Sequence, residues 1–171
     1  FRSNDPDTAI YFANEAIALA TGLDNKTGII NAYLYKGIAT KNLGNFEEAL
    51  KNDMAALSMC DQLLASDKKI NKLNILKLKA GAQSSIGSVY EEQGNYAEAL
   101  KYNEEALKIR QETGDKPGLA ASYNNIGNIY ADQGNNPKAL KFFLAGLKIK
   151  EEIGDKKSIS ISYNNIGSLY Y

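Results

Sequence analysis

The chain has 171 residues, of which 20 are basic and 20 are acidic, and it contains no histidine. This neutral balance gives no electrostatic reason to bind nucleic acid or an anionic membrane, and the lack of histidine removes the commonest general base and metal ligand. One cysteine excludes an internal disulfide, and no apolar run approaches the ~18 residues of a membrane-spanning helix. We therefore expect no enzyme activity, cofactor, metal site, nucleic-acid partner or membrane insertion.

Short turn signals divide the chain into eight expected helices. Glycine accepts the left-handed conformation that ends a helix, and a following asparagine or aspartate caps the next one. Gly-Asn pairs at 44–45, 94–95 and 134–135 indicate turns within helix pairs, and Gly-Asp pairs at 114–115 and 154–155 indicate turns between pairs. In chain order we expect helices at residues 6–21, 27–42, 46–65, 69–92, 96–112, 117–132, 136–152 and 157–171.

Two of these turns carry a further signal, and one turn is less regular. Asn45 with Glu48, and Asn95 with Glu98, have the spacing of a capping box. The first turn, Thr21-Gly22-Leu23-Asp24, is a looser version of the Gly-Asp signal. From it we expect Gly22 to end the first helix and Asp24 to cap the second.

One sequence returns along the chain with a period of 40 residues. Ser-Tyr-Asn-Asn-Ile-Gly occurs at 122–127 and again at 162–167, and Gly37 and Gly87 mark two earlier copies. A fixed period of this size is the signature of a stacked array of repeats. The first and last helices read as half-units, at residues 1–22 and 157–171, so we expect a fragment of a longer array.

The unit around Gly127 carries a resemblance to a known family. The residues concerned are large and small side chains at fixed positions: Tyr123, Ile126, Gly127, Tyr130, Ala139, Phe143 and Gly146. They resemble the tetratricopeptide repeat (TPR) family, whose usual period is about 34 residues. The longer period here, with Asn-Asn-Ile-Gly and Gly-Asp-Lys, is similar to kinesin light chains, to GoLoco-containing spindle-orientation adaptors, and to sensor arrays that precede bacterial histidine kinases and cyclases. The unit around Gly37 departs from the pattern, with Lys36 and Thr40 at two of its positions.

The resemblance implies an all-α fold, a right-handed TPR α-solenoid of antiparallel helix pairs that forms a single domain over residues 1–171. It also implies a function, which is protein–protein interaction through a peptide or protein segment bound in the concave groove. The alternative is a sensory or assembly module, able to dimerise, within a larger signalling protein. The sequence leaves the compartment open between the cytoplasm and a bacterial extracytoplasmic space.

The second unit is about ten residues longer than the others, and the extra residues lie within an extended helical hairpin at about 58–80. We expect its turn near Ser66-Asp67. Either the hairpin closes a small core of its own, with Leu63 and Leu64 packed on Ile70 and Leu73, or it projects as a contact surface. The sequence alone keeps both alternatives.

By analogy with the family, residues at fixed offsets from each first-helix glycine face the groove. The candidate peptide-binding residues are Ser84, Ser85, Ser88, Glu91, Asn124, Asn125, Asn128, Asp132, Asn164 and Asn165. Asparagine is a poor helix-interior residue, so five on inward positions need a reason. A carboxamide offers a donor and an acceptor, so a row of them can hold a peptide backbone. The alternative is that they cap or bridge neighbouring helices.

Three further expectations follow from position in the repeat. The Lys and Arg clamp by which chaperone receptors of the family hold a terminal carboxylate is missing, and the acidic middle of the groove favours a neutral or basic segment. Cys60 aligns with Arg110 and Lys150, which indicates a surface position. The last helix exposes apolar residues that predict end-to-end self-association: Ile161, Ile166, Leu169, Tyr170 and Tyr171.

Overall fold

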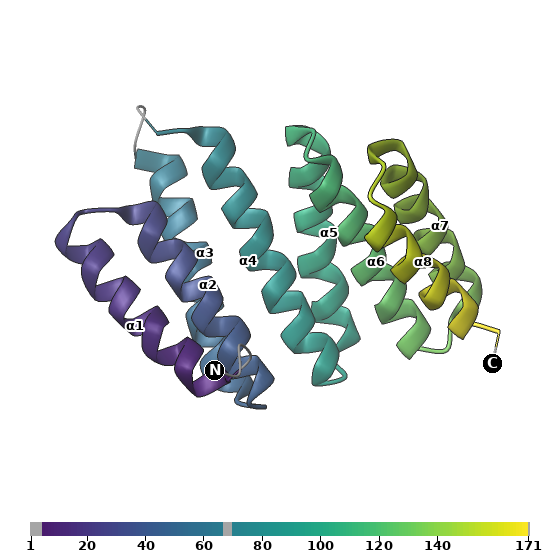
Figure 1. Cartoon of the computed structure of the whole chain (residues 1–171), viewed down its shortest axis with the longest axis horizontal. Coiled ribbons are helices and arrows are strands. Elements are labelled where there is room, and N and C mark those ends of the chain that lie inside the picture. Colours follow the sequence, from purple (N-terminus) through teal and green to yellow (C-terminus); the bar gives the residue numbers. More distant parts are fainter. Residues whose placement is uncertain (1–4, 67–69, 171) are drawn as a thin grey trace.

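The computed structural model describes residues 5–66 and 70–170, and in these residues it contains eight α-helices and no strand. The helices follow one another along the molecule from one end to the other (Figure 1). Their bounds are α1 (Pro6–Gly22), α2 (Lys26–Asn42), α3 (Phe46–Ser66), α4 (Lys72–Glu92), α5 (Tyr96–Thr113), α6 (Lys116–Asp132), α7 (Asn136–Ile153) and α8 (Lys156–Ser168). The expected all-helical solenoid is confirmed.

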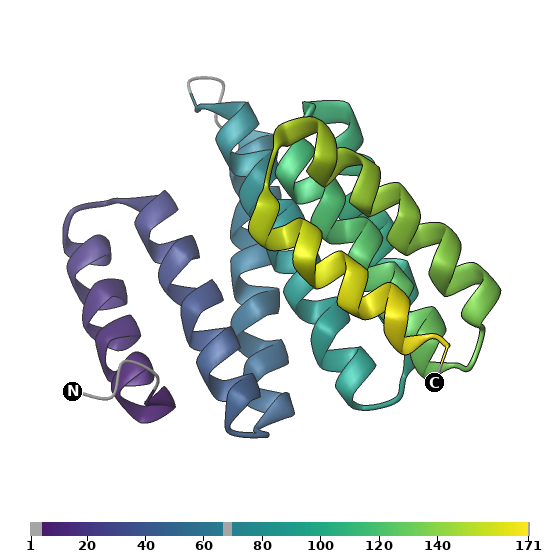
Figure 2. The same ribbon diagram turned by 45° about the vertical axis from the view of Figure 1, so that its right-hand side comes forward.

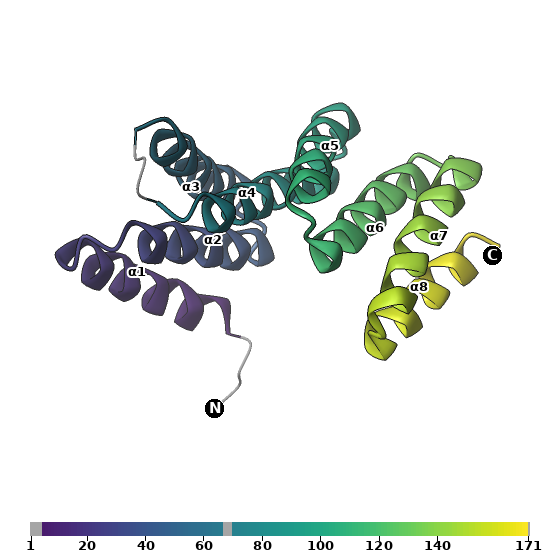
Figure 3. The same cartoon turned by 90° about the horizontal axis from the view of Figure 1, so that it is seen from above.

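Each helix packs on the next one along the chain, and α2 also contacts α4 while α4 contacts α6. Turned by 45°, the molecule shows the helices as successive tilted layers (Figure 2). Seen from above, α3 and α5 lie along one side of the row that contains α2, α4 and α6 (Figure 3). The first helix of each pair therefore lies beside the first helix of the next pair, as stacked repeats require.

The turns form as their residues dictate. Gly44, Gly94 and Gly134 have φ between 72° and 75°, and the asparagine after each accepts a hydrogen bond from the backbone N–H three residues later. Asp115 and Asp155 cap α6 and α8 in the same way. These caps satisfy backbone donors that a helix leaves unpaired at its start, so each turn ends one helix and begins the next.

The first turn differs from its expectation. Gly22 remains inside α1, Asp24 takes the left-handed conformation with φ 49°, and Asn25 caps α2 by accepting from the Gly28 N–H. The Asn25 N–H donates to the Ala20 carbonyl just as the Asp115 N–H donates to the Arg110 carbonyl, so Asp24 and Asn25 take the places that Gly114 and Asp115 have in the later turn. Asp24 tolerates this conformation better than most residues other than glycine.

Two helix bounds also differ. The fourth helix begins at Lys72 rather than 69, because Asn71 caps it by accepting from the Asn74 N–H. The last helix ends at Ser168, and Leu169 and Tyr170 form a turn. The expected turn at Ser66-Asp67 lies partly outside the described residues; α3 reaches Ser66.

Close helix crossings are made at the repeated glycines. A Cβ added at Gly37, Gly87 or Gly127 would collide with the side chain of Asp53, Asn103 or Phe143, respectively, on the following helix. At Gly127 the nearest ring atoms of Phe143 would lie 2.5 Å from it. The glycine thus makes room for a side chain of the partner helix, whatever its polarity.

The longer second unit closes an apolar cluster between α2, α3 and α4. Its buried members are Ile30, Ala56, Cys60, Leu63, Ile75 and Ala82. Leu64 and Ile70 pack against this cluster, whereas Leu73 is 48% exposed and lies outside it. The expectation for Leu73 was therefore wrong, because Ile75, two residues further on, is the α4 side chain that enters the core.

Candidate functional site

The ten candidate groove residues lie on α4, α6 and α8, the first helices of three successive units. Asn164 and Asp132 are exposed, and the others are half-buried. The structure brings some of them into direct contact with one another or with buried residues of the second helices. Three features describe this part of the molecule: a carboxamide set, an ion pair beside a buried carboxylate, and two cations bonded to buried serines.

The carboxamide set spans α5, α6 and α8. Asn165 Nδ2 donates to Asn124 Oδ1 at 3.0 Å, and Asn125 Nδ2 donates to Asn103 Oδ1 at 3.3 Å. Asn103 is fully buried and donates to the Ala99 carbonyl at 2.9 Å. Some of the carboxamides therefore bridge neighbouring helices. Since a carboxamide has two donor hydrogens and an acceptor oxygen, Asn124, Asn125 and Asn165 keep capacity for another partner.

The other two asparagines are not used in this way. Within the described part of the chain, the side chains of Asn128 and Asn164 form no hydrogen bond. Asn164 is exposed and Asn128 is half-buried. Their amide groups therefore contribute no hydrogen bond to the described part of the fold.

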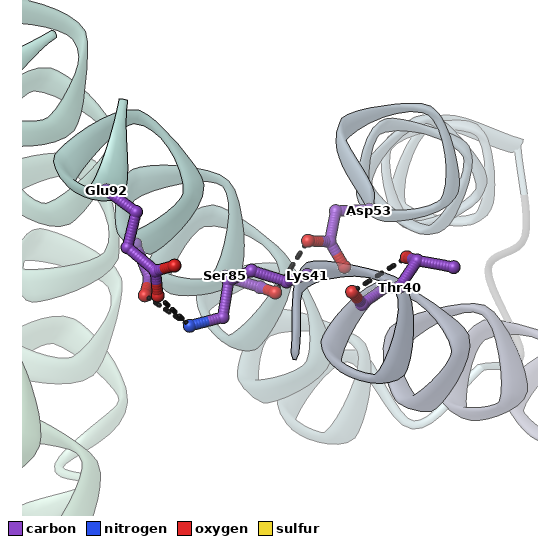
Figure 4. A network of polar contacts seen from close by, with 7 residues as sticks. Thr40, Lys41, Asp53, Ser85 and Glu92 are labelled. Carbon is purple, nitrogen blue, oxygen red and sulfur yellow. Dashed lines mark hydrogen bonds and ion pairs between the residues drawn. The ribbon is translucent and has the colours of Figure 1, made fainter. Parts of the chain in front are cut away.

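An ion pair connects α2 to α4 in the middle of the array. Lys41 pairs with Glu92 and also donates to Ser88 Oγ at 3.3 Å (Figure 4). One turn earlier on α4, Ser85 Oγ donates to Asp53 Oδ2 at 2.6 Å. Two of the three candidate serines are thus bound to neighbouring helices. The third, Ser84, has a buried hydroxyl oxygen without a hydrogen-bond partner among the described residues.

Asp53 is a buried carboxylate that sequence reasoning missed. Burial raises the pKa of Asp53 to about 7, although the bond from Ser85 and the charge of Lys41 both lower it. Its Oδ1 has no hydrogen-bond partner in the described residues. The repeat held the signal, because Asp53 stands where Asn103 and Phe143 face the glycines of their own units.

In the middle of the groove, the carboxyl groups of Glu91 and Asp132 lie near each other and have the same charge. The pKa of Glu91 is raised to about 7, first by burial and then by the nearby carboxylate of Asp132. Glu92 raises it further, while Lys41 opposes the shift. Near neutral pH the Glu91 carboxyl therefore holds its proton more readily than an ordinary glutamate, so this part of the groove is less negative than its sequence indicates.

The expectation for Cys60, Arg110 and Lys150 was wrong. Cys60 is fully buried and Lys150 is only 7% exposed. Arg110 donates to Ser122 Oγ and Lys150 donates to Ser162 Oγ, both at 2.6 Å. Burial lowers the pKa of both cations. Because arginine and lysine are charged, the sequence suggested surface positions for Arg110 and Lys150. On each following helix, however, a serine twelve positions later provides a buried acceptor.

None of the helices in the described residues is long and apolar enough to cross a membrane.

Comparison with known proteins agrees with this architecture. The sequence pattern of the tetratricopeptide repeat family matches residues 78–152. The crystal structure of BtubC (BKLC) from P. vanneervenii is similar with a TM-score of 0.78 and 21% identity, over 97% of this chain and 66% of that protein. This chain therefore spans just under two thirds of that relative's length.

A second similar structure comes from a kinesin light chain candidate of Podosopora anserina with nearly identical TPR-like repeats. Its TM-score is 0.68 at 16% identity, and the match covers 96% of this chain and 77% of that one. No curated protein sequence matches the chain. At these identities the structural likeness establishes the fold alone.

Proposed function

Because residues 78–152 belong to the tetratricopeptide repeat family and the surrounding helices repeat the same fold, we propose that the chain binds a peptide or protein segment along the face of α2, α4, α6 and α8. Repeats of this family are in general protein-interaction scaffolds and not enzymes. The observation that carries the proposal is the set of carboxamides on α6 and α8, which offers hydrogen-bond groups that the fold does not use.

A segment bound there meets two kinds of surface. At the α2 end, Tyr35 is 67% exposed and Ile38 is 45% exposed, and both lie at the inward positions of the first unit. At the α6 and α8 end, Asn128 and Asn164 present unbonded amides. The backbone of an extended bound segment presents one donor and one acceptor at each residue, and carboxamides can pair with both. Tyr35 and Ile38 can cover apolar side chains of that segment.

The test uses two double variants in an affinity capture read by mass spectrometry, with thermal melting measured on the same samples. Asn128→Ala with Asn164→Ala removes amides that the fold does not use, so we expect an unchanged melting temperature and about tenfold weaker binding. Asn125→Ala with Asn165→Ala removes bridging amides as well, so both quantities fall.

The matched control is Asn14→Ala, an exposed asparagine on α1, which carries no candidate groove residue. We expect it to capture the same partner as the wild-type chain. Normal capture by the Asn128 and Asn164 double variant would show that the carboxamides do not recognise the partner.

A second proposed function is assembly, and the two end helices favour it. On α6, Tyr123 and Tyr130 pack against Phe142 of α7. Their equivalents, Tyr163 on α8 and Tyr170 in the turn that follows it, are 56% and 73% exposed, and no atom lies within 4 Å of a Cβ placed on Gly167. The free face of α8 thus repeats the face of α6 that α7 covers.

Helix α1 presents the opposite half of that interface. Phe12, which is 63% exposed, stands in the register of Phe142. Ala9 and Ala16 are exposed, whereas their equivalents Ala139 and Gly146 are buried against α6. A second copy's α1 therefore offers α8 the surface that α7 offers α6, and the contact is head-to-tail.

Sedimentation velocity over a concentration series tests the assembly proposal. The wild-type chain should associate reversibly, and Phe12→Ser or Tyr170→Ser should give a monomer at every concentration. Because both residues are exposed, neither change should alter the melting temperature of the monomer. A wild-type chain that stays monomeric at millimolar concentration would contradict this second function.

A further inference from the structure

The strongest unassigned feature is a cavity of about 380 Å³ between α1 and α2, at the end of the array opposite to α8 (Figure 1). All of its lining residues belong to α1, to α2 or to Asp5, which precedes α1. Tyr35 and Ile38 line it on α2, and both are inward positions of the first unit. On α1 the exposed Ala9 lines it. The cavity therefore lies beside the face that the proposed function uses.

The second unit shows what occupies the equivalent place inside the array. Counted from the repeated glycines, Ile38 and Asn42 of α2 correspond to Ser88 and Glu92 of α4. There Lys41, from the preceding first helix, pairs with Glu92 and donates to Ser88 Oγ at 3.3 Å (Figure 4). Inside the array, a first helix thus covers this place. The cavity between α1 and α2 is the place that one more first helix would cover.

The charges of the two end helices favour α8 of a second copy as that helix. Helix α1 carries Asp7 and Glu15 and no basic residue, whereas α8 carries Lys156 and Lys157 and no acidic residue. Opposite charges favour a contact between α8 and α1, while a contact of α1 with α1, or of α8 with α8, would bring like charges together. The occupant that fits is therefore a second copy in the head-to-tail orientation.

A contact inside the array indicates which residues meet at such a junction. Asn165, two residues before the glycine of α8, donates to Asn124, three residues before the glycine of α6, at 3.0 Å. Tyr35 stands two residues before the glycine of α2, and Asn164 stands three residues before the glycine of α8. By the same register, Asn164 of one copy lies beside Tyr35 of the next copy.

We propose that two copies of the chain form one segment-binding site between them, in which Asn164 of one copy and Tyr35 of the next contact the same segment. Within one chain α4 and α6 separate these two residues (Figure 1), so only a junction between copies brings them together. Asn164 is exposed and forms no hydrogen bond in the described residues, and Tyr35 is 67% exposed. Both are thus available to a segment.

The segment that fits this composite site is uncharged and extended where it crosses the junction. Its backbone pairs with the Asn164 amide, and an apolar side chain packs on Tyr35 and Ile38. The inference rests on both proposed functions, segment binding and assembly, and it couples them. Because the segment contacts both copies, it stabilises their association, and association in turn strengthens segment binding.

A cross-linking experiment tests whether the two residues meet. Full chains with Asn164→Cys are mixed with chains that carry Tyr35→Cys, a short bismaleimide is added, and linked pairs are measured by mass spectrometry. The native Cys60 is fully buried and does not compete. We expect linked pairs from this mixture. The control replaces Tyr35→Cys with Asn14→Cys on α1, which corresponds to the exposed Leu144 of α7 and should give far fewer linked pairs.

A binding experiment tests whether the two residues share a segment. The probe is a short fluorescent peptide, selected from a random display library in solution at a concentration at which the wild-type chain associates. Because both residues are exposed, Asn164→Ala or Tyr35→Ala should leave the melting temperature unchanged. Each change should weaken peptide binding by about fivefold.

Mixing the two variants gives the decisive result. The α8 end of a Tyr35→Ala chain and the α1 end of an Asn164→Ala chain form an intact junction, so an equimolar mixture should bind the peptide more tightly than either variant alone. The control mixture contains Asn164→Ala chains and chains with both changes. It has no intact junction and should show no gain.

The outcomes separate this inference from the functions on which it rests. No gain in the mixture of single variants, or equal cross-linking by the Asn14→Cys control, would overturn the composite site. A peptide that binds a strictly monomeric chain, and binds the single variants more weakly, would overturn the composite site and leave the groove function standing. A library that yields no peptide would overturn the groove function and the composite site together.

Discussion

The second helices at the two ends of the array, α3 and α7, place their buried polar side chains at opposite locations, and α5 between them has a polar side chain at both. Where the end of each second helix meets the next first helix, the N-terminal half has the apolar pairs Ala20/Ala32 and Cys60/Ala82. The C-terminal half has Arg110/Ser122 and Lys150/Ser162 at the same location. At the glycine crossings the order is reversed, with polar Asp53 and Asn103 in the earlier units and apolar Phe143 in the later one.

This exchange shows what the repeat requires and what it leaves free. Both locations must be filled, and the polar side chains found there each have a hydrogen-bond partner, but either kind of side chain satisfies the geometry. Ser85 donates to Asp53, while Ser122 accepts from Arg110 and Ser162 accepts from Lys150. The polar partner on the facing helix, rather than the buried residue alone, decides which chemistry a unit can hold. Four substitutions test this rule.

The largest effect should come from giving an apolar location a charge without a partner. Cys60→Lys places an ammonium in the cluster of Ile30, Leu63 and Ile75, where Ala82 offers no hydroxyl. We expect a loss of about 3–5 kcal/mol in the free energy of unfolding, measured by urea denaturation. Adding Ala82→Ser should restore about 1 kcal/mol or more. If the double variant is no more stable than the single one, the partner rule is wrong.

Gly127→Leu should be the next most damaging change. The added side chain would collide with the Phe143 ring, so we expect a loss of more than about 2 kcal/mol. Gly167→Leu is the matched control, because a Cβ there meets no atom within 4 Å, and its effect should stay within about 0.5 kcal/mol. Similar losses for the two variants would contradict the crossing geometry.

Asp53→Asn should stabilise the chain in a pH-dependent way. Burial raises the pKa of Asp53 to about 7, whereas an unfolded aspartate has a pKa of about 3.9. The folded state therefore holds this proton more tightly, and stability falls as the pH rises from about 4 to about 7 and then levels off. We expect Asp53→Asn to add a few kcal/mol, at most about 4, at pH 8 and almost nothing at pH 4.

Urea denaturation at these two pH values checks the Asp53 prediction. Glu91, whose pKa is also raised to about 7, should leave a smaller slope of the same sign in the variant. Asn103, which already occupies the equivalent position, shows that the amide fits there. An identical pH slope in the variant and the wild-type chain would exclude Asp53 as its source.

The smallest effect should come from making a polar location apolar. Arg110→Met with Ser122→Ala removes a half-buried arginine and its buried acceptor and reproduces the chemistry of the N-terminal half. Since replacing a buried polar pair with apolar residues is often neutral, we expect a change within about 1 kcal/mol in either direction. Ser122→Ala alone should be worse than the double change, because it leaves the guanidinium without its acceptor.

The sequence predicted the features that depend on local chemistry. Gly94 and Asn95 specify their turn regardless of what packs on it, so the helix bounds on either side agree with the structure. The first turn was misassigned because Gly22 suggested the helix end, whereas Asp24 takes the left-handed place of the glycine and Asn25 is the cap. Aligned units with clear turn signals were therefore the reliable part of the prediction.

Features that depend on a facing helix could not be obtained in this way. Lys150 was assigned to the surface by its residue type, and its burial becomes clear only when Ser162 is placed opposite it. The asparagines were assigned to one row, but Asn125 turned out to bond Asn103 of the neighbouring helix while Asn128 bonds nothing within the described residues. Spacing along one helix gives the direction of a side chain, whereas its partner is determined by packing between helices.

The single side-chain bond between α6 and α8 has a consequence for hydrogen exchange in the last described helix. This helix packs mainly on α7 and is tied to α6 by the Asn165–Asn124 hydrogen bond. Because local opening must break the contacts that hold a segment, Asn165→Ala should speed amide hydrogen exchange throughout α8 and leave the exchange of α4 unchanged.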